Sequence, residues 1–391
     1  MHGKILKMLN RQYTETIESR IINNPVVAIL GPRQCGKTTL AKLIMANHPD
    51  SVYIDLEKPS DLSKLDNAEW FFSANRGKLI CIDEIQRKPE LFALLRSIVD
   101  ETNENGQFLV LGSASRDLIR QSSESLAGRI SYFTLSPLLV NEIAKDTSIE
   151  KYLTRGGFPR SFLASSDEYS FQWRKDFITT FIERDILQFK GVVPAAIRRL
   201  MTMIAHVNGQ TINYSSIGNS LGISNVALKN NIDLLSGSFI LNIVPQVNRN
   251  TGKRLVKAPK IYFSDPGIVE ALLNLRNFNS IVSHPAFGSL WETLVLMNLS
   301  GNFPDAEISF YRTSNGAELD FIVMDNDTTV CIECKTNSNP VLTKGNFISI
   351  EDLKPVKTFV VSPVTNSYEY AENIIVTPLS ALPGLIREQL S

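Results

Sequence analysis

The residues with the clearest chemical potential form a glycine-bracketed run near the N-terminus. The run GPRQCGKT at 31–38 has the spacing G-x-x-x-x-G-K-[ST], in which backbone N–H groups and a helix N-terminus face phosphate oxygens. Lys37 is expected to reach the β- and γ-phosphates of a nucleotide, and Thr38 to bind Mg²⁺ through its hydroxyl. The sequence therefore predicts a site for ATP and Mg²⁺, in which the nucleotide-binding residues are Gly31, Pro32, Arg33, Gln34, Cys35, Gly36, Lys37, Thr38 and Thr39.

An acidic pair follows this loop at the end of a second apolar run. The segment LICIDEIQ places four apolar residues directly before Asp83 and Glu84. Ligands bind at the carboxyl ends of the strands in a parallel sheet, so Asp83 would hold Mg²⁺ and Glu84 would polarise the attacking water. An Asp-Glu pair after a strand is common, and this prediction depends on its combination with the phosphate loop.

Another group of ionisable residues lies in the last hundred residues, in two runs that are typical of strands. In VCIECK, alternation along a strand places Glu333 and Lys335 on one face. In GAELDFIV, Glu318 and Asp320 share a face in the same way, and a predicted helix upstream carries Glu292. A helical Glu, a strand Asp and a Glu-x-Lys strand together resemble the core of PD-(D/E)XK nucleases.

This resemblance implies a second site for Mg²⁺. Asp320, Glu333 and Glu292 would bind the ion through oxygen ligands. The metal would activate water for attack on a phosphodiester, with Lys335 orienting the water or neutralising the developing charge. A Glu-x-Lys strand is common, and the same fold also occurs as an inert scaffold, so cleavage and a non-catalytic role both stay open.

The middle of the chain is strongly basic. Residues 186–264 contain nine Lys or Arg and one acid, Asp233, which gives this segment a net charge of +8 in a chain whose overall charge is zero. Such asymmetry is typical of a nucleic-acid surface. Two short helices separated by Gly222, followed by a basic hairpin, predict a winged helix. Its outward residues would be Ser224, Asn225, Lys229 and Asn230. Because winged helices also bind proteins, both DNA and a protein partner remain candidates.

The elements that must position these residues follow from the apolar pattern. Strands are expected at 26–30, 52–56, 79–82 and 108–112, alternating with helices. This alternation predicts an α/β protein with a doubly wound parallel sheet of the P-loop NTPase type. Further on, a helix at 288–300 precedes strands at 308–312, 318–324, 329–334 and 357–362. The expected domains are 10–146 (P-loop ATPase), 147–280 (helical and winged-helix region) and 281–391 (α/β restriction-endonuclease-like domain).

Length and composition agree with this organisation. The chain has 391 residues, of which 43% are hydrophobic and 20% charged, enough for two to four globular domains. We expect a cytoplasmic protein without a membrane segment, because the sequence has no apolar stretch of about 20 residues and no secretory signal pattern. The Cys331–Cys334 pair has no further Cys or His nearby, which favours core packing over zinc binding.

The ordered set of motifs resembles a known family. GPRQCGKTTL, LICIDEIQ, LVLGSAS and SLAGR, followed by GGFPR, ERDI and GAELDFIV, are similar to prokaryotic AAA+-type ATPases that carry a C-terminal domain of unknown function. The resemblance covers almost the whole chain. It implies a P-loop ATPase, a winged-helix region and a nuclease-like end, and no settled biological task.

Two further catalytic candidates follow from this resemblance. Ser113 in LGSAS lies where AAA+ proteins place a polar residue that positions water near the γ-phosphate, although an ordinary turn serine would look the same. Arg129 in SLAGR is the preferred arginine finger among Arg116, Arg120 and Arg129. A finger acting between subunits implies a homo-oligomer, whereas the alternative for Arg129 is a surface arginine without a catalytic contact.

These observations lead to two competing functions. The first is an ATP-hydrolysing protein that associates with DNA through 186–264 and carries an Mg²⁺-dependent nuclease domain. The second is a nucleotide-controlled signalling or scaffold switch, in which the C-terminal domain binds a protein partner and cuts nothing. A metabolic kinase has little support, because it would leave the basic segment unexplained.

Overall fold

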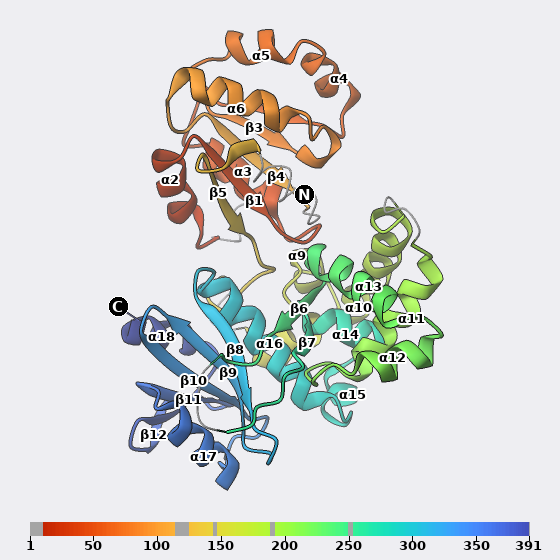
Figure 1. The fold of residues 1–391 in the computed structure, drawn as a ribbon, viewed down its shortest axis with the longest axis vertical. Helices are drawn as coiled ribbons and strands as arrows, with labels where there is room; N and C mark the ends of the chain where they lie inside the picture. The colour runs from red at the N-terminus through yellow and green to blue at the C-terminus, as the bar shows by residue number, and fades with distance from the viewer. Residues whose placement is uncertain (1–10, 114–124, 144–146, 188–191, 249–252, 391) are drawn as a thin grey trace. The chain divides into compact units, whose positions relative to one another are not determined.

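The computed structural model describes residues 11–113, 125–143, 147–187, 192–248 and 253–390 (Figure 1). The chain forms two compact units. The N-terminal unit is Met1–Pro137 with Gly237–Phe239, and the C-terminal unit is Leu138–Ser236 with Ile240–Ser391. The expected domain boundaries near 146 and 280 stay predictions, but the middle and last regions lie within one compact unit.

The N-terminal unit contains a five-stranded parallel sheet with the order β2-β3-β4-β1-β5. Four strands agree with the sequence prediction: β1 (Val26–Leu30), β2 (Val52–Asp55), β3 (Ile80–Asp83) and β4 (Phe108–Gly112). The pattern did not predict β5 (Ile130–Thr134), because this edge strand is largely half-buried and is not a continuous apolar run. The parallel α/β fold is therefore confirmed.

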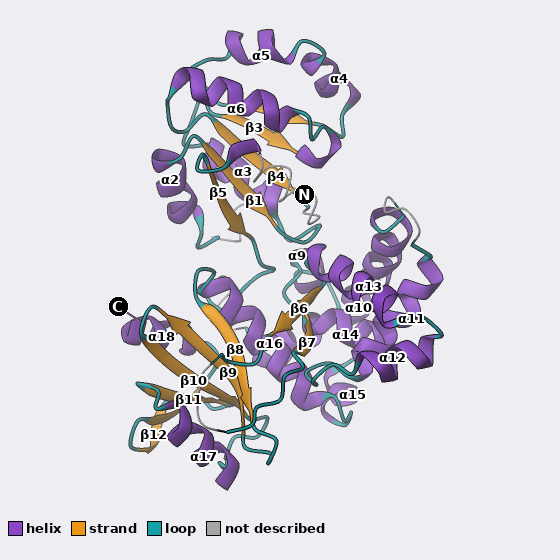
Figure 2. Ribbon diagram, in the orientation of Figure 1, coloured by secondary structure: helices purple, strands orange, loops and turns teal. Residues whose placement is uncertain are grey.

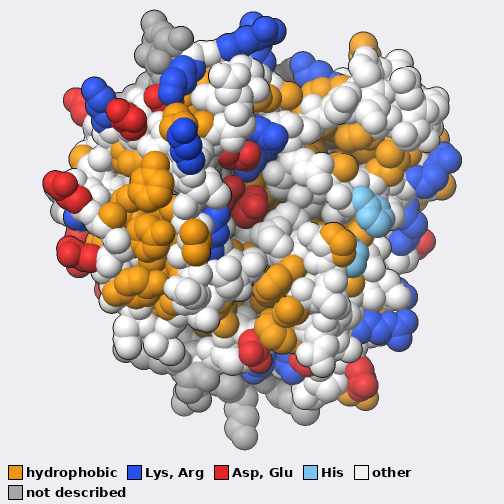
Figure 3. All heavy atoms as spheres, turned by 90° about the horizontal axis from the view of Figure 1, so that it is seen from below, with side chains coloured by type: hydrophobic (Ala, Val, Ile, Leu, Met, Phe, Trp, Pro, Cys, Tyr) orange, Lys and Arg blue, Asp and Glu red, His pale blue; other side chains and the backbone are white. Residues whose placement is uncertain are grey.

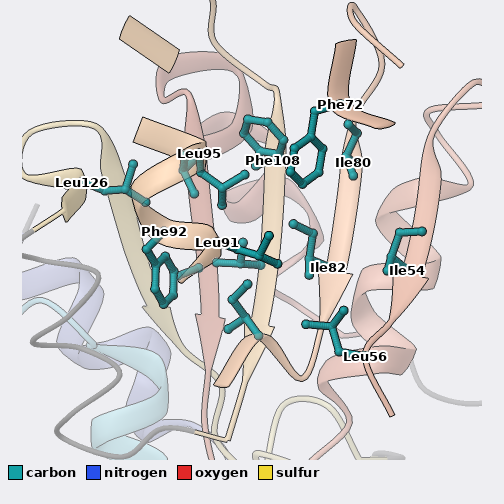
Figure 4. Packing of buried hydrophobic residues seen from close by; sticks show 14 of the residues in the cluster. Ile54, Leu56, Phe72, Ile80, Ile82, Leu91, Phe92, Leu95, Phe108 and Leu126 are labelled. Atoms are coloured by element: carbon teal, nitrogen blue, oxygen red, sulfur yellow. The ribbon is translucent and has the colours of Figure 1, made fainter. Parts of the chain in front are cut away.

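Helices surround this sheet, and Figure 2 shows their alternation with the strands. They are α2 (Thr14–Asn23), α3 (Lys37–Met45), α4 (Pro59–Leu62), α5 (Ala68–Ala74) and α6 (Leu91–Thr102), with short 3-10 turns at Ser63–Leu65 and Ile85–Arg87. In Figure 4, side chains of α6 pack onto those of β3 and β4. Each fully buried Leu, Ile or Phe of this core contributes about 1.5–3 kcal/mol, which fixes the strands that carry the phosphate loop and the acidic pair.

The first part of the C-terminal unit is helical, as expected. It contains α8 (Ile149–Arg155), α9 (Pro159–Phe162), α10 (Asp167–Thr180), a π-helix at Phe181–Asp185, α11 (Pro194–His206), α14 (Pro266–Leu272) and α15 (Phe278–Val282). None of the helices in the described ranges has the length and hydrophobicity of a membrane-spanning segment.

A buried polar network joins these helices at the GGFPR run. Asp265 caps α14 and accepts hydrogen bonds from the backbone N–H groups of Gly157 (2.6 Å) and Gly267 (2.8 Å). Burial raises the pKa of Asp265 to about 6, against the opposing effect of these hydrogen bonds. Gly156 has a φ of +67°, and a Cβ there would lie 2.2 Å from Asp265 Oδ1. The first glycine of the run is therefore required by this close approach.

A helix-turn-helix follows, formed by α12 (Tyr214–Leu221) and α13 (Asn225–Gly237). As expected, Gly222 ends the first helix in the left-handed conformation, and Ser224 Oγ accepts a hydrogen bond from Ala227 N (3.2 Å). The next hairpin pairs β6 (Leu241–Val244) with β7 (Lys260–Phe263) in antiparallel register. The residues at 249–252, in the expected basic tip, lie outside the described part of the chain.

The connection between β6 and β7 lies against the edge of the C-terminal sheet, at the strand β8 (Glu307–Arg312). Gln246 bridges to Phe310, and Leu255 bridges to Thr313. Lys253 Nζ contacts both carboxylate oxygens of Asp352 at 2.6 Å. The described residues at both ends of the β6–β7 connection thus pair with the edge of the C-terminal sheet. An edge strand has backbone hydrogen-bonding groups that are not used within its own sheet.

The chain ends in a mixed six-stranded sheet with the order β12-β13-β11-β10-β9-β8. Its strands are β8 (Glu307–Arg312), β9 (Glu318–Asp325), β10 (Thr328–Cys334), β11 (Lys357–Val361), β12 (Tyr368–Ala371) and β13 (Ile374–Thr377). The helices α16 (Phe287–Asn302), α17 (Lys344–Leu353) and α18 (Leu382–Leu390) pack against it. The expected helix and four strands are present, and the structure adds β12, β13, α17 and α18.

Candidate functional sites

The phosphate loop lies between β1 and α3, as the sequence predicted. Gly31 has a φ of +146°, and a Cβ at this position would lie 2.4 Å from the backbone oxygen of Leu135. Gly36, with a φ of +106°, directly precedes α3. Both positions require the conformational freedom of glycine. The loop therefore presents its backbone at the N-terminus of α3, where the helix dipole favours an anion.

Lys37 points into this loop. Its side chain is buried, and Nζ donates hydrogen bonds to the backbone oxygens of Gly31 and Pro32, each at 2.9 Å. The positive charge is thus held among the loop atoms that would surround a phosphate. Arg11, which the sequence analysis did not identify, donates from Nη1 to the oxygen of Cys35 (3.2 Å). This buried arginine holds the loop backbone at Cys35, and no motif in the sequence indicates it.

Asp83 at the end of β3 lies beside the loop. Thr38 Oγ1 donates to Asp83 Oδ2 at 2.7 Å, and Tyr53 on β2 donates to the same oxygen at 2.6 Å. Burial, followed by the contact with Asp83, raises the pKa of Tyr53, so this phenol stays a neutral donor. The hydroxyl and carboxylate expected to hold Mg²⁺ are therefore adjacent. Tyr53 was missed because only the pairing of β2 with β3 brings it to Asp83.

The structure also brings together the two residues expected to act on water. Glu84 has a φ of +58°, and its N–H donates to Asp83 Oδ1 at 2.9 Å. Gln86 Nε2 donates to a carboxylate oxygen of Glu84 and to Ser113 Oγ, the latter at 3.1 Å. Glu84 and Ser113 are thus joined through one amide. Gln86 is a further candidate that its position two residues after Glu84 could have suggested.

Arg129 lies at the other end of the sheet. Its backbone oxygen accepts a hydrogen bond from Val26 N at the start of β1, roughly 13 Å along the strand from the phosphate loop. Its side chain pairs with Asp100 on α6. Arg129 therefore does not reach the phosphate loop of its own subunit. That it acts as an arginine finger in a neighbouring subunit stays a prediction. Arg116 and Arg120 lie outside the described residues.

The C-terminal candidates also converge on one site. Lys335 Nζ donates to Glu333 Oε1 at 2.7 Å, and Asp320 Oδ2 accepts from the backbone N–H of Cys334 at 2.9 Å. Glu292 on α16 accepts a hydrogen bond from Tyr262 at 2.6 Å. Burial raises the pKa of both Glu292 and Glu333 to about 8, and the Asp320 charge is the next cause for each. Burial and the neighbouring Asp320 thus both disfavour ionisation of these two carboxyl groups.

Lys260, which the sequence analysis placed in the basic segment, lies in this site. It is 3% exposed, and Nζ is 2.8 Å from Glu318 Oε1, 3.3 Å from Asp320 Oδ1 and 4.0 Å from Glu292 Oε2. Burial alone would lower the pKa of Lys260, but the three carboxylates outweigh it and raise the pKa. Its burial shows that Lys260 does not contribute to an exposed basic surface.

The carboxylates in this arrangement do not fit a bound Mg²⁺. Hard oxygen ligands are present, but an ammonium group already lies among three of them. Within the ranges that the structure describes, no three His, Cys, Asp or Glu side chains are placed so that they could hold a metal ion. The expected metal ligands Glu292, Asp320 and Glu333 are therefore brought close together without forming a metal centre.

The exposed basic residues of 186–264 are distributed over several elements. Arg198 and Arg199 on α11 and Lys229 on α13 are exposed. Ser224, Asn225 and Asn230 are exposed as well, as expected for an outward helix face. On the face drawn in Figure 3, Lys and Arg side chains lie among Asp and Glu side chains and form no single continuous patch.

Comparison with protein families divides the chain into three matched regions. Residues 23–144 match a family described as an AAA domain. Residues 146–279 and 287–382 match two families described as domains of unknown function, DUF8612 and DUF4143. The AAA match, with the parallel sheet and the phosphate loop, supports ATP binding and hydrolysis.

Two curated relatives cover most of the chain. The uncharacterized proteins Rv2008c of Mycobacterium tuberculosis and Mb2031c of Mycobacterium bovis are each 36% identical over 355 residues, which is 90% of this chain and 80% of the relative.

Among solved structures, the Walker-type ATPase PABY2304 of Pyrococcus abyssi aligns with a TM-score of 0.48 at 16% identity, over 68% of this chain and 95% of that one. The RuvB Holliday junction branch migration motor of Thermotoga maritima aligns with a TM-score of 0.29 at 18% identity, over 61% and 90%. The ATPase assignment follows from the AAA match and the strand order of this chain.

Proposed function

The chain belongs to the family of the uncharacterized protein Rv2008c of Mycobacterium tuberculosis, and its residues 23–144 match an AAA domain; we propose that it hydrolyses ATP and couples the nucleotide state to an interaction with DNA. The observation that carries the ATPase proposal is the meeting of Lys37, Thr38 and Asp83 at the carboxyl ends of β1 and β3.

Each residue has a defined part in this proposal. Lys37 neutralises the β- and γ-phosphates, and the backbone N–H groups of 31–38 surround them. Thr38 and Asp83 hold the Mg²⁺ that accompanies ATP, because a hydroxyl and a carboxylate are hard oxygen ligands. Glu84, positioned by Gln86, polarises the attacking water, and Ser113 orients that water on the side of the γ-phosphate.

The DNA part of the proposal is supported by charge and by local structure. The exposed end of α13 presents Ser224, Asn225, Lys229 and Asn230 beside a tight turn. In helix-turn-helix proteins the N-terminal residues of the second helix contact base edges, and neighbouring cations contact phosphates. The net charge of +8 over 186–264 favours a polyanionic partner.

The test measures ATP turnover with Mg²⁺, with and without duplex DNA, and DNA binding by fluorescence anisotropy over a series of salt concentrations. We expect DNA to increase turnover. We expect Lys229→Ala to weaken binding and to reduce the salt slope by about one. Lys344→Ala, which removes an exposed lysine at the start of α17, is the matched control. No binding by the unaltered protein at low salt, together with no stimulation, would refute the DNA part.

The position of Lys260 favours a second candidate for the C-terminal unit. In this candidate the ammonium group of Lys260 lies among the carboxylates. The C-terminal unit then has a nuclease-like fold, binds a protein partner and does not cleave DNA. The first candidate is a nuclease in which Asp320 and Glu333 are required for phosphodiester cleavage.

Incubating plasmid with the purified protein and Mn²⁺ separates the two candidates. The partner-binding candidate predicts intact plasmid. Cleavage that is lost in both Glu333→Ala and Lys335→Ala would instead establish the nuclease. Cleavage that persists in both variants would come from a contaminant and would leave the partner-binding candidate standing.

A further inference from the structure

The backbone at Lys260 is fixed on both sides. Lys260 is the first residue of β7 and pairs with Val244 of β6. On its other side it forms a bridge with Thr211. Backbone hydrogen bonds flank this bridge, from Ile212 N to Pro259 O (2.9 Å) and from Ile261 N to Gln210 O (3.1 Å). A residue held between two neighbours in this way has a fixed side-chain direction, because side chains stand roughly perpendicular to the sheet.

The side chain of Lys260 joins two other elements. Glu318 and Asp320 come from β9, and Glu292 comes from α16. The ammonium group reaches all three within 4.0 Å, and Nζ also lies 5.5 Å from the centre of the Phe310 ring. A lysine is rarely fully buried unless it is paired. These contacts supply the acceptors and the aromatic face that a desolvated ammonium needs.

This arrangement is the coordination of an ammonium and not of a divalent metal. Mg²⁺ requires near-octahedral oxygen ligands at about 2.0–2.1 Å, whereas Lys260 Nζ lies 2.8 Å from its nearest carboxylate oxygen. Among the residues with described positions, no group of three metal-ligating side chains is suitably placed. The carboxylates are therefore spaced around a larger and more weakly charged centre.

We propose that Lys260 is the built-in cation of the C-terminal carboxylate site, occupying the place that a divalent metal would take and excluding Mg²⁺ and Mn²⁺ from Glu292, Glu318 and Asp320. The ammonium neutralises the carboxylates from inside the fold. A metal would have to displace a buried lysine whose backbone is fixed. The C-terminal unit is then metal-independent, and its carboxylates serve to lock β7 to β9 and α16.

Replacing Lys260 with methionine removes the charge and keeps a similar length. We expect Lys260→Met to gain a Mn²⁺ site that the unaltered protein lacks, because carboxylates left without their cation attract another. In calorimetric titration of the nucleotide-free protein with MnCl₂, Lys260→Met should bind Mn²⁺ at least about tenfold more tightly than any Mn²⁺ binding seen with the unaltered protein. The melting temperature of Lys260→Met should also rise with Mn²⁺ by more than that of the unaltered protein.

Two further variants identify the source of the signal. Lys260→Arg keeps the positive charge and should not gain the Mn²⁺ site. Adding Asp320→Asn to Lys260→Met should abolish the gained binding. If Lys260→Met does not fold, the single variant Asp320→Asn tests the proposal. Our proposal requires that Asp320→Asn bind Mn²⁺ as the unaltered protein does, and a loss of binding would contradict it.

The proposal is overturned if the unaltered protein binds Mn²⁺ as tightly as Lys260→Met and loses that binding with Asp320→Asn. It is also overturned if a folded Lys260→Met gains no binding. ATP turnover measured on the same samples reports on the nucleotide site alone, so failure here is distinguishable from failure of the ATPase proposal.

Discussion

Lys37→Ala is expected to reduce ATP turnover about 100- to 1,000-fold, the usual loss when one preorganised charge donor is removed from a transition state. The reason is local, since Lys37 Nζ lies inside the loop at 2.9 Å from two of its backbone oxygens. The side chain of Lys37 is buried in the loop, whereas Arg33, the other cation of 31–38, is only half-buried. Release of phosphate from ATP in the presence of Mg²⁺ gives the turnover, and a fluorescent nucleotide gives the affinity.

A matched control separates this effect from a general loss of charge. Lys78 is exposed and precedes β3. It therefore lies near the amino ends of the parallel strands, whereas the phosphate loop lies at their carboxyl ends. Lys78→Ala should leave turnover within about twofold, because surface substitutions rarely exceed ±0.5 kcal/mol. Undiminished turnover or nucleotide affinity in Lys37→Ala, with an unchanged circular dichroism spectrum, would contradict the assignment of the site.

Arg174→Met is expected to lower the free energy of unfolding of the C-terminal unit by about 3–5 kcal/mol, because it leaves a buried carboxylate without its partner. Arg174 Nη1 lies 2.5 Å from Glu270 Oε2, and the two residues are 1% and 0% exposed. Burial raises the pKa of Glu270, and Arg174 opposes this effect. Urea unfolding followed by tryptophan fluorescence, to which Trp173 on the same helix contributes, measures the loss.

The double variant Arg174→Met/Glu270→Leu should recover most of this stability. Within the described residues, Arg174 Nη2 and Glu270 Oε1 have no hydrogen-bond partner. The contacts of the pair therefore only partly offset the free energy of removing both charges from water. Apolar replacements of similar size are often neutral or stabilising at such sites. Lys175→Met, at an exposed neighbouring position of α10, is the control and should change stability by less than about 0.5 kcal/mol. If the double variant were as unstable as Arg174→Met, apolar side chains could not replace the ion pair, and this prediction would be wrong.

Much of the fold could be predicted from the sequence, because the signals are local. The strands β1, β3 and β4 are continuous apolar runs, and β9 and β10 also follow the expected spans. The edge strands β5 and β12 could not be predicted in this way. Both are largely half-buried or exposed, and a strand at the edge of a sheet needs fewer apolar residues. In addition, β5 pairs with β1, which lies far earlier in the chain, whereas β12 pairs with β13, which directly follows it.

Residue types and their spacing were enough to predict the phosphate loop. Its glycines, lysine and threonine act through backbone geometry and neighbours within eight positions, so type and spacing are sufficient. The residues around Lys260 are different. Lys260 belongs to the basic segment by position in the chain, and 60 residues separate it from Asp320. Only the packing of β7, β9 and α16 decided that this lysine is buried among carboxylates, because a charge in the interior must meet its counter-charges wherever in the chain they lie.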